Sequence, residues 1–584
     1  MGNVNVSPHV PATPGASVTA RAPARSPAHR AVAGRLLAEL PPSARREVQD
    51  VVDWAGPVAL PLTDERTVQS ACGIAQVHGR ASGTPEHLAV PYAATVAGVL
   101  TALGVHAALL ARRRGLALRR VTTSVAQGAL LSLTQYLAAA TAPEDPADDP
   151  APGGASLVSA DGVTCEIETL APDAWREFWR RLGVEPALAG RGWAPFQQRF
   201  ATGSCPLPPE LRRAANAHPL TDLAEAARAA GLSLVALPDD PDPSGLPAPL
   251  RTACAPGRAR RELPAAEGAL PLSGLQVVEV TNRVQGPLAG HLLRLLGARV
   301  LRVEPPGGDP MRGLPPLAGG VSARFAALNA GKSVAEIDLA TPAGRRAVAE
   351  LAAGADVFLH NWPPGRAERL GLTAADLWRV RPGLVHAAAS GFGDAFGRAV
   401  PPIGTDYLAQ AHGGLAAALR PAGHAPTPSL MTLTDVLGGA LCAHGAVSAL
   451  LRRAGAGRGA RVESSLLSAA ALVPRPRARA VLTPLDQPLR TADGWLALPA
   501  DAAADPARLA RVTGVLTRAP GAVAERFTTR ATEEWRAALA EAGVAAVPVV
   551  TELPALARDP AFRAAVAPAP PGGHARPRTP WTFS

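Results

Sequence analysis

The feature that most constrains the fold of this chain is an internal repeat. When the sequence is shifted by 341 residues, the segment 91–114 aligns without a gap on 432–455. The register continues beyond these segments, and its identical pairs include Gly98 with Gly439, Gly104 with Gly445, and Ser124 with Ser465. Self-similarity on this scale indicates a duplicated folding unit rather than a chance likeness between Ala-rich helices. We therefore expect two versions of one module in the chain.

A second match follows the first in the same order. The tripeptide ADG occurs at 160–162 and again at 492–494. In both places alternating apolar residues predict a strand after it, and a helical pattern comes next. Two ordered matches around non-helical landmarks support the duplication.

The two copies are not chemically equivalent. Asp435 of the second copy falls on Ala94 of the first, so a carboxylate has become a methyl group. The first copy also shows no counterpart of the strand-rich stretch 272–395. We interpret it as a partial, chemically silent copy that serves as a scaffold.

Stretches rich in Pro, Gly and Asp divide the chain. They lie at 142–154 and at 239–250, the second continuing towards Gly268, where a domain boundary is expected. The predicted organisation is a disordered arm over 1–40, a degenerate copy over 41–265 and a complete module over 266–584, with a nucleotide-binding part at 272–395 and a smaller α+β domain at 485–584.

Strands and helices alternate in the complete module. A strand at 275–280, a Gly-bearing turn, a helix and a strand at 299–306 form a βαβ pattern, and further strands are expected at 332–339, 356–361 and 383–393. The predicted fold is α/β, a Rossmann-like doubly wound parallel sheet with ligands at the carboxyl ends of its strands. The AGKS tetrapeptide at 330–333 is not a P-loop, because Ala326 stands where Gly is needed and a strand follows it.

Composition excludes several classes of protein. The net charge of +10 comes with one lysine, Lys332, among 58 basic residues, and these are scattered among 48 acids, which indicates codon bias and not nucleic-acid binding. Five scattered cysteines fit neither a disulfide framework nor a metal site, so a cytoplasmic location is expected. No signal peptide is visible. The apolar stretch 90–110 is interpreted as a buried helix and not a membrane span.

Six segments, in order, carry a resemblance to a known family: LSGLQVVEVTNRVQGPLAGHLLRLLGARVLRVEPPGGDPMR, LNAGKSVAEIDL, HNWPPGRAERLGL, SGFG, GTDYLAQAHGG and TLTDVLGGALCA. Together they resemble the family III CoA-transferases, the CaiB/BaiF group, which includes formyl-CoA transferase and alpha-methylacyl-CoA racemase. The likeness is strong over 272–470 and moderate over 485–580. The first copy matches only the later part of the pattern, at about 85–240, as in tandem members of the family.

The resemblance implies a nucleophile at Asp435. A transferase of this family moves CoA from an acyl-CoA to a carboxylic acid through an aspartyl-CoA thioester, without a tightly bound cofactor. Gly438 and Gly439 are expected to leave room for that thioester. The alternative role for Asp435 is a helix N-cap.

The same resemblance implies contacts to CoA. These expected binding residues are Val284, Gln285, Gly286, Asn361, Trp362, Arg369 and Phe392, with Arg312 as substitute for an arginine that some members carry where Pro305 stands. Lys332 is as compatible with a structural role as with a binding role.

Two other functions stay open. A racemase or isomerase of the family needs a His where this chain has Thr405, and Thr is no base near neutral pH; His412 lies nearby in another register. The family's glycine-rich lid and C-terminal tail are not visible, so a non-catalytic acyl-CoA-binding scaffold is the third reading. Because family members are intertwined dimers, we expect an intramolecular pseudo-dimer or a homodimer.

Overall fold

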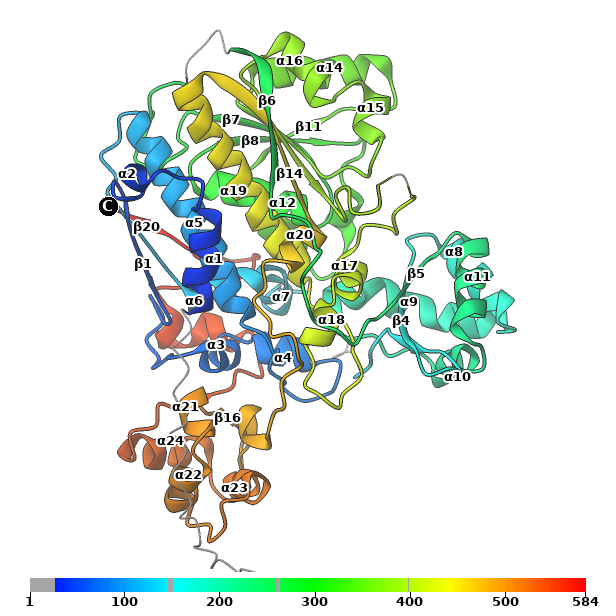
Figure 1. Ribbon diagram of the computed structural model, residues 1–584, viewed down its shortest axis with the longest axis vertical. Coiled ribbons are helices and arrows are strands. Elements are labelled where there is room, and N and C mark those ends of the chain that lie inside the picture. Colours follow the sequence, from blue (N-terminus) through cyan, green and yellow to red (C-terminus); the bar gives the residue numbers. More distant parts are fainter. Residues whose placement is uncertain (1–26, 145–150, 259–262, 398) are drawn as a thin grey trace, which may run out of the picture.

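A seven-stranded sheet organises the second half of the chain (Figure 1). The structure is a computed structural model, and it describes residues 27–144, 151–258, 263–397 and 399–584. Across the sheet the strands are β11 (Ser333–Glu336), β8 (Arg299–Glu304), β7 (Gln276–Val280), β12 (Val357–His360), β13 (Val385–Ser390), β14 (Arg458–Ser465) and β6 (Arg251–Arg258).

Six of these strands are parallel, and β6 pairs antiparallel with β14 at one edge. Numbered along the chain, the parallel strands lie in the order 3-2-1-4-5-6, which is that of a doubly wound dinucleotide-binding sheet. The predicted α/β fold is therefore confirmed. Its switch point, where ligands are expected, lies between the carboxyl ends of β7 and β12.

Alternate residues of each strand point to opposite faces of the sheet, and the apolar residues on both faces are covered by helices. Val357 and Leu359 of β12 join the core formed with α12 and α19, whereas Phe358 packs on the side of α14 and α16. The elements of this half, besides the sheet, are α12 (Gln285–Leu295), η1 (Pro310–Gly313), β9 (Leu317–Ala318), β10 (Val321–Ser322), α13 (Ala323–Asn329), α14 (Pro342–Gly354), α15 (Arg366–Leu370), α16 (Ala374–Val380), α17 (Asp406–His412), α18 (Leu415–Ala418), α19 (Leu433–Ala456) and α20 (Leu466–Ala470).

The first copy repeats the later part of this arrangement. Its elements are β1 (Gln49–Asp53), α3 (Glu65–Ala71), α4 (Ile74–Gly79), α5 (Tyr92–Arg113), β2 (Arg120–Ser124), α6 (Val125–Ser132) and α7 (Thr134–Ala140). Ser124 caps α6 and Ser465 caps α20, each by accepting the N–H three residues on, in nearly the same backbone conformation. The repeat seen in the sequence is therefore a repeat of structure.

The copy is also longer than the sequence suggested. Strand β1 pairs in parallel with β2 as β13 pairs with β14, so β1 is the counterpart of β13. The expectation that nothing in the first copy matches 272–395 was therefore too broad.

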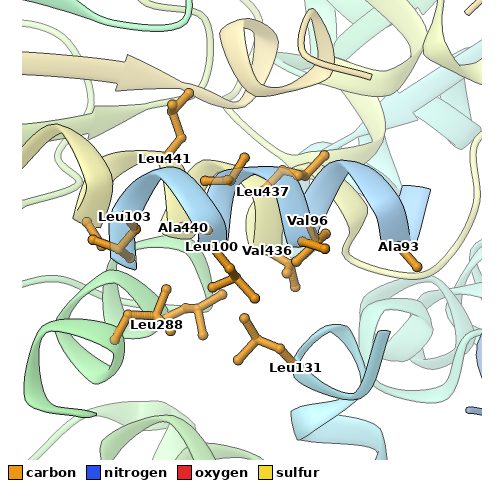
Figure 2. Packing of buried hydrophobic residues seen from close by; sticks show 14 of the residues in the cluster. Ala93, Val96, Leu100, Leu103, Leu131, Leu288, Val436, Leu437, Ala440 and Leu441 are labelled. Carbon is orange, nitrogen blue, oxygen red and sulfur yellow. The ribbon is translucent and has the colours of Figure 1, made fainter. Parts of the chain in front are cut away.

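Helices α5 and α19 lie side by side at the centre (Figure 2). Val96 and Leu100 of α5 pack with Val436 and Leu437 of α19, and Leu288 of α12 closes the same core. Both helices are long and apolar enough to cross a membrane, but the apolar windows are 100% and 94% buried inside the protein. They are core helices, as expected for 90–110.

Each copy carries one smaller domain with a three-stranded antiparallel sheet. The first contains β3 (Leu157–Val158), β4 (Thr164–Glu168), α8 (Pro172–Arg181), α9 (Pro186–Thr202), α10 (Pro209–Asn216), α11 (Leu220–Ala230) and β5 (Ser233–Ala236). The second contains η2 (Pro484–Asp486), β15 (Leu489–Arg490), β16 (Trp495–Ala497), α21 (Ala500–Ala503), α22 (Pro506–Thr513), α23 (Pro520–Arg526), η3 (Phe527–Thr529), α24 (Thr532–Glu541) and β17 (Val547–Pro548).

The two ADG turns have the same function. Asp161 accepts the N–H of Leu220 at 3.1 Å, and Asp493 accepts that of Thr532 at 2.8 Å. In each smaller domain the aspartate thus holds the start of a later helix, which explains why the tripeptide is present in both copies.

The copies interlock. The first copy's smaller domain packs on α17 of the second, where Tyr407 enters its core and Ile403 N–H donates to Ser233 at 2.9 Å. Conversely, α3 of the first copy contacts β16 and β17. The end of the chain returns to the first copy through α25 (Ala555–Arg558), η4 (Pro560–Phe562), β18 (Val566–Ala567), β19 (Arg576–Pro577) and β20 (Thr582–Phe583), with β20 paired to β2. The predicted smaller domain at 485–584 is therefore too long, because the last part of this range packs on the first copy.

The N-terminal segment is only partly as expected. Residues 1–26 of the predicted arm lie outside the described residues. The disordered arm is wrong for α1 (Ala28–Leu36), and α2 (Pro42–Arg45) begins the part that was expected to be folded. Val32 is 3% exposed, and a Cβ at Gly98 of α5 would lie 2.7 Å from the Cβ of Val32. The glycine lets α1 approach α5 closely, and this burial orders the segment.

Candidate active site

Asp435 lies in the first turn of α19, as its third residue. The N-cap position is Thr432, so the alternative reading of Asp435 as the N-cap is wrong. A carboxylate in the first helical turn is stabilised by the helix dipole. Among the described residues the Asp435 carboxyl group makes no hydrogen bond, which leaves it free to react.

Asp406, the first residue of α17, lies beside it. The backbone N–H of Asp435 donates to the Asp406 carboxylate at 2.7 Å, and Gln410 also donates to that carboxylate. Ser429 N–H in turn donates to Gln410 at 2.9 Å. Asp406 is not among the residues expected from the sequence, although it is the third residue of the GTD tripeptide that contains Thr405.

Both carboxyl groups have a raised pKa. Burial, then the charge of Asp406, raise the pKa of Asp435 well above its ordinary value, and the Arg283 guanidinium opposes this. Burial raises the pKa of Asp406 to about 6 against the hydrogen bonds that it accepts. Because those hydrogen bonds favour the ionised form of Asp406, Asp435 is the group that holds the proton at rest.

Arg283 occupies a strained turn between β7 and α12. Its φ of 61° is the only positive value at a non-glycine residue in the described part of the chain. The Asn361 side chain holds the residue before Arg283 by both backbone groups: it donates to Asn282 O at 2.9 Å and accepts Asn282 N–H at 3.0 Å. A left-handed residue costs about 1 kcal/mol or more, and the Asn361 contacts offset it. The predicted Asn361 therefore orders the turn that brings Arg283 towards Asp435.

Val284, the N-cap, and Gln285 and Gly286 lie at the βα turn that starts α12, and α12 packs against α19. Gln285 donates to Ser390 O at 3.3 Å. Gly286 lacks a Cβ that would otherwise lie 2.5 Å from the Cβ of Thr281. This turn therefore sits close to the helix that carries Asp435.

The expected role of Gly438 and Gly439 is wrong in this structure. A Cβ at Gly438 would lie 2.7 Å from the side-chain nitrogen Nε2 of Gln285, and a Cβ at Gly439 would lie 2.7 Å from the backbone oxygen of Gln285. The space that these glycines leave is filled by α12. They bring the two helices together and do not hold a pocket open for a thioester.

Trp362 lines two cavities beside the sheet. It is buried and stacks on His360, with the ring centroids 4.5 Å apart. One cavity, of about 310 Å³, lies over β7, β8 and β11, and Arg366 lines it. The other, of about 690 Å³, lies over β12, β13 and β14. Arg369, which was expected to contact a phosphate, lines neither cavity.

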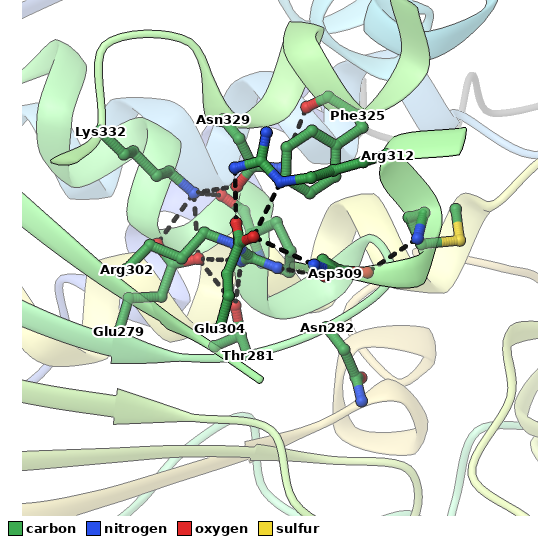
Figure 3. A network of polar contacts seen from close by, with 12 residues as sticks. Glu279, Thr281, Asn282, Arg302, Glu304, Asp309, Arg312, Phe325, Asn329 and Lys332 are labelled. Carbon is green, nitrogen blue, oxygen red and sulfur yellow. Dashed lines mark hydrogen bonds and ion pairs between the residues drawn. The ribbon is translucent and has the colours of Figure 1, made fainter. Parts of the chain in front are cut away.

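Arg312 and Lys332 are engaged by buried carboxylates (Figure 3). Arg312 donates twice to Glu304, at 2.8 and 2.9 Å, and its guanidinium lies 4.5 Å from the Phe325 ring. Lys332 lies 2.8 Å from a Glu279 oxygen and donates to Pro287 O and Asn329. Lys332 is therefore held in the interior by these contacts, and Arg312 lines neither of the two cavities.

Phe392 lies apart from these residues. It packs edge-on against Phe396 and His412, at 5.3 and 5.8 Å, and lines neither of the two cavities. Of the expected binding residues, the structure brings together those of the first turn, Asn361 and Trp362, and it leaves out Arg312, Arg369 and Phe392.

The first copy preserves the support of this site without a counterpart of the Asp435 carboxyl group. Glu65 accepts the N–H groups of Ala93 and Ala94 at 2.7 and 2.9 Å, and Gln69 donates to Glu65 at 3.0 Å. Glu65 and Gln69 correspond to Asp406 and Gln410 in the repeat register. Burial raises the pKa of Glu65 to about 7. The first copy therefore has a carboxyl group, that of Glu65, which binds the N–H groups at the start of α5. It has no carboxyl group on α5 at the position of Asp435, where Ala94 stands.

No metal centre emerges from the part of the chain that the structure describes, since no group of three or more His, Cys, Asp or Glu side chains lies close enough to bind an ion.

A known family matches both copies of the module. The model of CoA-transferase family III matches residues 55–239 and 272–569. The chain is 34% identical over 198 residues to acetyl-CoA:oxalate CoA-transferase of Acetobacter aceti, covering 34% of this chain and 51% of that protein. It is 35% identical over 201 residues to succinyl-CoA:glutarate CoA-transferase of Mus musculus, covering 34% and 46%. The chain thus spans about half the length of the curated relatives it matches.

Among solved structures, a CAIB/BAIF family protein from Brucella suis is 26% identical, with 54% of this chain and 93% of that chain covered and a TM-score of 0.48.

Proposed function

Because this chain belongs to CoA-transferase family III, we propose that its second copy transfers CoA from an acyl-CoA to a carboxylic acid. The observation that carries the proposal is Asp435 itself: a carboxyl group in the first turn of α19, without a hydrogen bond of its own, beside Arg283 and Asp406. The names of relatives such as the oxalate and glutarate transferases support the same reaction class.

The proposed reaction alternates anhydrides and thioesters on Asp435. The ionised carboxylate attacks the thioester carbonyl of the donor, and CoA leaves as the thiolate. The thiolate then attacks the Asp435 carbonyl carbon, releases the donor acid and forms an aspartyl-CoA thioester. The acceptor carboxylate attacks this thioester, and the thiolate released finally attacks the acceptor carbonyl. The products are a new acyl-CoA and free Asp435.

Arg283 and Asp406 have opposite effects on the first step. Arg283 favours the ionised, nucleophilic form of Asp435, whereas the charge of Asp406 disfavours it. Asp406 also accepts the Asp435 N–H and so fixes the backbone that carries the nucleophile. We assign CoA to the carboxyl ends of β7 and β12, along Val284–Gly286 and Trp362, with Arg366 in place of Arg369.

The racemase alternative lacks a base opposed to Asp435. Thr405 occupies the position of the family's His, and its hydroxyl oxygen is buried without a hydrogen-bond partner among the described residues. His412 packs between Phe392 and Phe396 instead. A threonine does not remove a proton at neutral pH, so transfer of CoA is the function that the site supports better.

Trapping the intermediate tests the proposal. The full chain is incubated with each of a panel of acyl-CoA donors, quenched with hydroxylamine and analysed by peptide mass spectrometry. We expect a hydroxamate on Asp435 and none in the Asp435→Asn variant. Binding of CoA without any adduct supports the scaffold reading, and deuterium uptake at the α-carbon without transfer supports the racemase reading; either result contradicts the proposal.

A further inference from the structure

Two side chains of the silent copy reach the start of the helix that carries Asp435. Tyr92, the first residue of α5, is fully buried and donates its hydroxyl hydrogen to Leu433 O at 3.0 Å. Gln135 of α7 donates to the Thr432 hydroxyl at 3.4 Å. Thr432 and Leu433 are the cap and the first residue of α19, so both contacts fall within three residues of Asp435.

These contacts are one-sided. In the repeat register Tyr92 corresponds to Leu433 and Gln135 corresponds to Pro476. Neither a leucine nor a proline side chain can donate a hydrogen bond, so the second copy cannot return either contact to the start of α5. Packing between two duplicated helices would be reciprocal. Here both donors belong to the first copy, and both acceptors belong to the second copy, which carries Asp435.

The start of α19 needs such outside support. The Thr432 side chain makes no capping hydrogen bond to its own helix. Asp406 binds the N–H of Asp435 at 2.7 Å, and Tyr92 binds the carbonyl of Leu433 in the same turn. The first turn is therefore held by one residue from each copy.

Tyr92 remains a hydrogen-bond donor throughout the working pH range. Burial raises its pKa well above the ordinary value, and the neighbouring Asp406 and Asp435 charges act in the same direction. The Ser132 hydroxyl opposes this shift only in part.

We propose that Tyr92, assisted by Gln135, is a positioning residue that fixes the first turn of α19 and thereby the direction from which Asp435 meets the thioester. The proposal rests on the proposed function. It makes the silent copy part of the active site, because a nucleophile acts efficiently only within a narrow range of positions. A partner subunit is then not needed to complete this side of the site.

The test compares Tyr92→Phe with Thr101→Val in the full chain. Thr101 lies on the same helix, is 1% exposed and donates to Ala97 O at 2.7 Å, so its variant also removes a buried hydroxyl group but far from Asp435. Three quantities are measured: kcat and KM for the acyl-CoA donor, the amount of Asp435 adduct, and amide hydrogen exchange of the peptide that contains 432–436.

We expect Tyr92→Phe to lower kcat about tenfold, which corresponds to the loss of one buried hydrogen bond, with KM unchanged within twofold. Exchange at 432–436 should become faster, and Thr101→Val should leave all three quantities near wild type. A Gln135→Leu variant should have a smaller effect in the same direction, since its bond is longer.

Equal losses in Tyr92→Phe and Thr101→Val, or a Tyr92→Phe variant with wild-type kcat, would overturn the positioning role. If the wild-type chain forms no adduct with any donor, the proposed function fails on its own. Faster exchange without a kinetic effect shows a contact that serves folding alone and also overturns the positioning role.

Discussion

At the scale of single residues, the site consists of two carboxyl groups that share a buried space. The Asp406 carboxylate is held ionised by the hydrogen bonds that it accepts from the Asp435 N–H and from Gln410. The Asp435 carboxyl group accepts no hydrogen bond from the described residues. Burial, and then the like charge of Asp406, raises the pKa of Asp435. A nucleophile with a raised pKa is more basic, but it is available only when the pH is high enough to ionise it.

The first prediction concerns this availability. Asp406→Asn removes the like charge while keeping an oxygen that accepts the Asp435 N–H. The pKa of Asp435 should fall, and the acidic limb of the kcat/KM profile should move to lower pH. A lower kcat at the plateau is also expected, because a neutral acceptor holds the N–H less strongly. An acidic limb at the wild-type position would show that Asp406 does not control the ionisation of Asp435.

The second prediction concerns stability. The folded pKa of Asp435 lies above its ordinary value of 3.8, so this group favours folding at low pH and loses that contribution as the pH rises. Asp435→Asn should therefore raise the melting temperature at pH 8, by about 2–4 °C, and have little effect at pH 4, as measured by calorimetry. A variant that is less stable than wild type at pH 8 would contradict the assigned ionisation.

Residues that depend on strand pairing were the hardest to predict. Asp435 and the turn at 284–286 could be placed from the sequence, because a helix start and a βα turn are local features. Arg312 and Lys332 could not, because Glu304 and Glu279 come near them only when the strands pair. The same applies to Gly438, whose small size accommodates Gln285, a residue distant in sequence.

At the scale of elements, α19 connects the site to both copies. It packs on α5 of the first copy and on α12 of the second, and Gly438 and Gly439 permit the approach to α12. The alternation of strands and helices was sufficient to predict the sheet and its parallel strands. The antiparallel edge strand β6 could not be predicted, since it comes from the linker between the copies.

The third prediction tests the approach of α12 to α19. A Cβ at position 439 would lie 2.7 Å from Gln285 O, so Gly439→Ala should push the helices apart and destabilise the protein by about 1–3 kcal/mol. Gly455→Ala is the matched control on the same helix, where nothing lies within 4 Å, and it should be neutral or stabilising. The free energies of unfolding are compared in urea, with kcat as a second measurement. Equal stabilities of the two variants would refute the close packing.

At the scale of the whole molecule, the chain has the organisation of an interlocked dimer within one polypeptide. The smaller domain of the first copy contacts α17, which bears Asp406, and the smaller domain of the second copy contacts α3, which bears Glu65. The last strand of the chain, β20, pairs with β2 of the first copy. The internal repeat predicted two modules. Their interlocking could not be predicted from the sequence, because a repeat register does not say which copy each smaller domain will cover.

This organisation makes the two copies unequal in function. The first copy keeps Glu65 and Gln69 but has Ala94 in place of Asp435. Of the parallel strands that precede β14 in the second copy, the described residues of the first copy contain one counterpart, β1, which matches β13. Ala94→Asp should therefore fail to create a second reactive site. It should also destabilise the chain, since the new carboxylate would be buried beside Glu65.

The most direct measurement of the central claim is the number and position of CoA thioesters formed per chain. Wild type and Ala94→Asp are each mixed with excess donor acyl-CoA and quenched with hydroxylamine, and the modified peptides are quantified by mass spectrometry. The account predicts one adduct per chain in both proteins, always on Asp435. A second adduct in either protein, an adduct at another residue, or none in a chain that still exchanges CoA would contradict it.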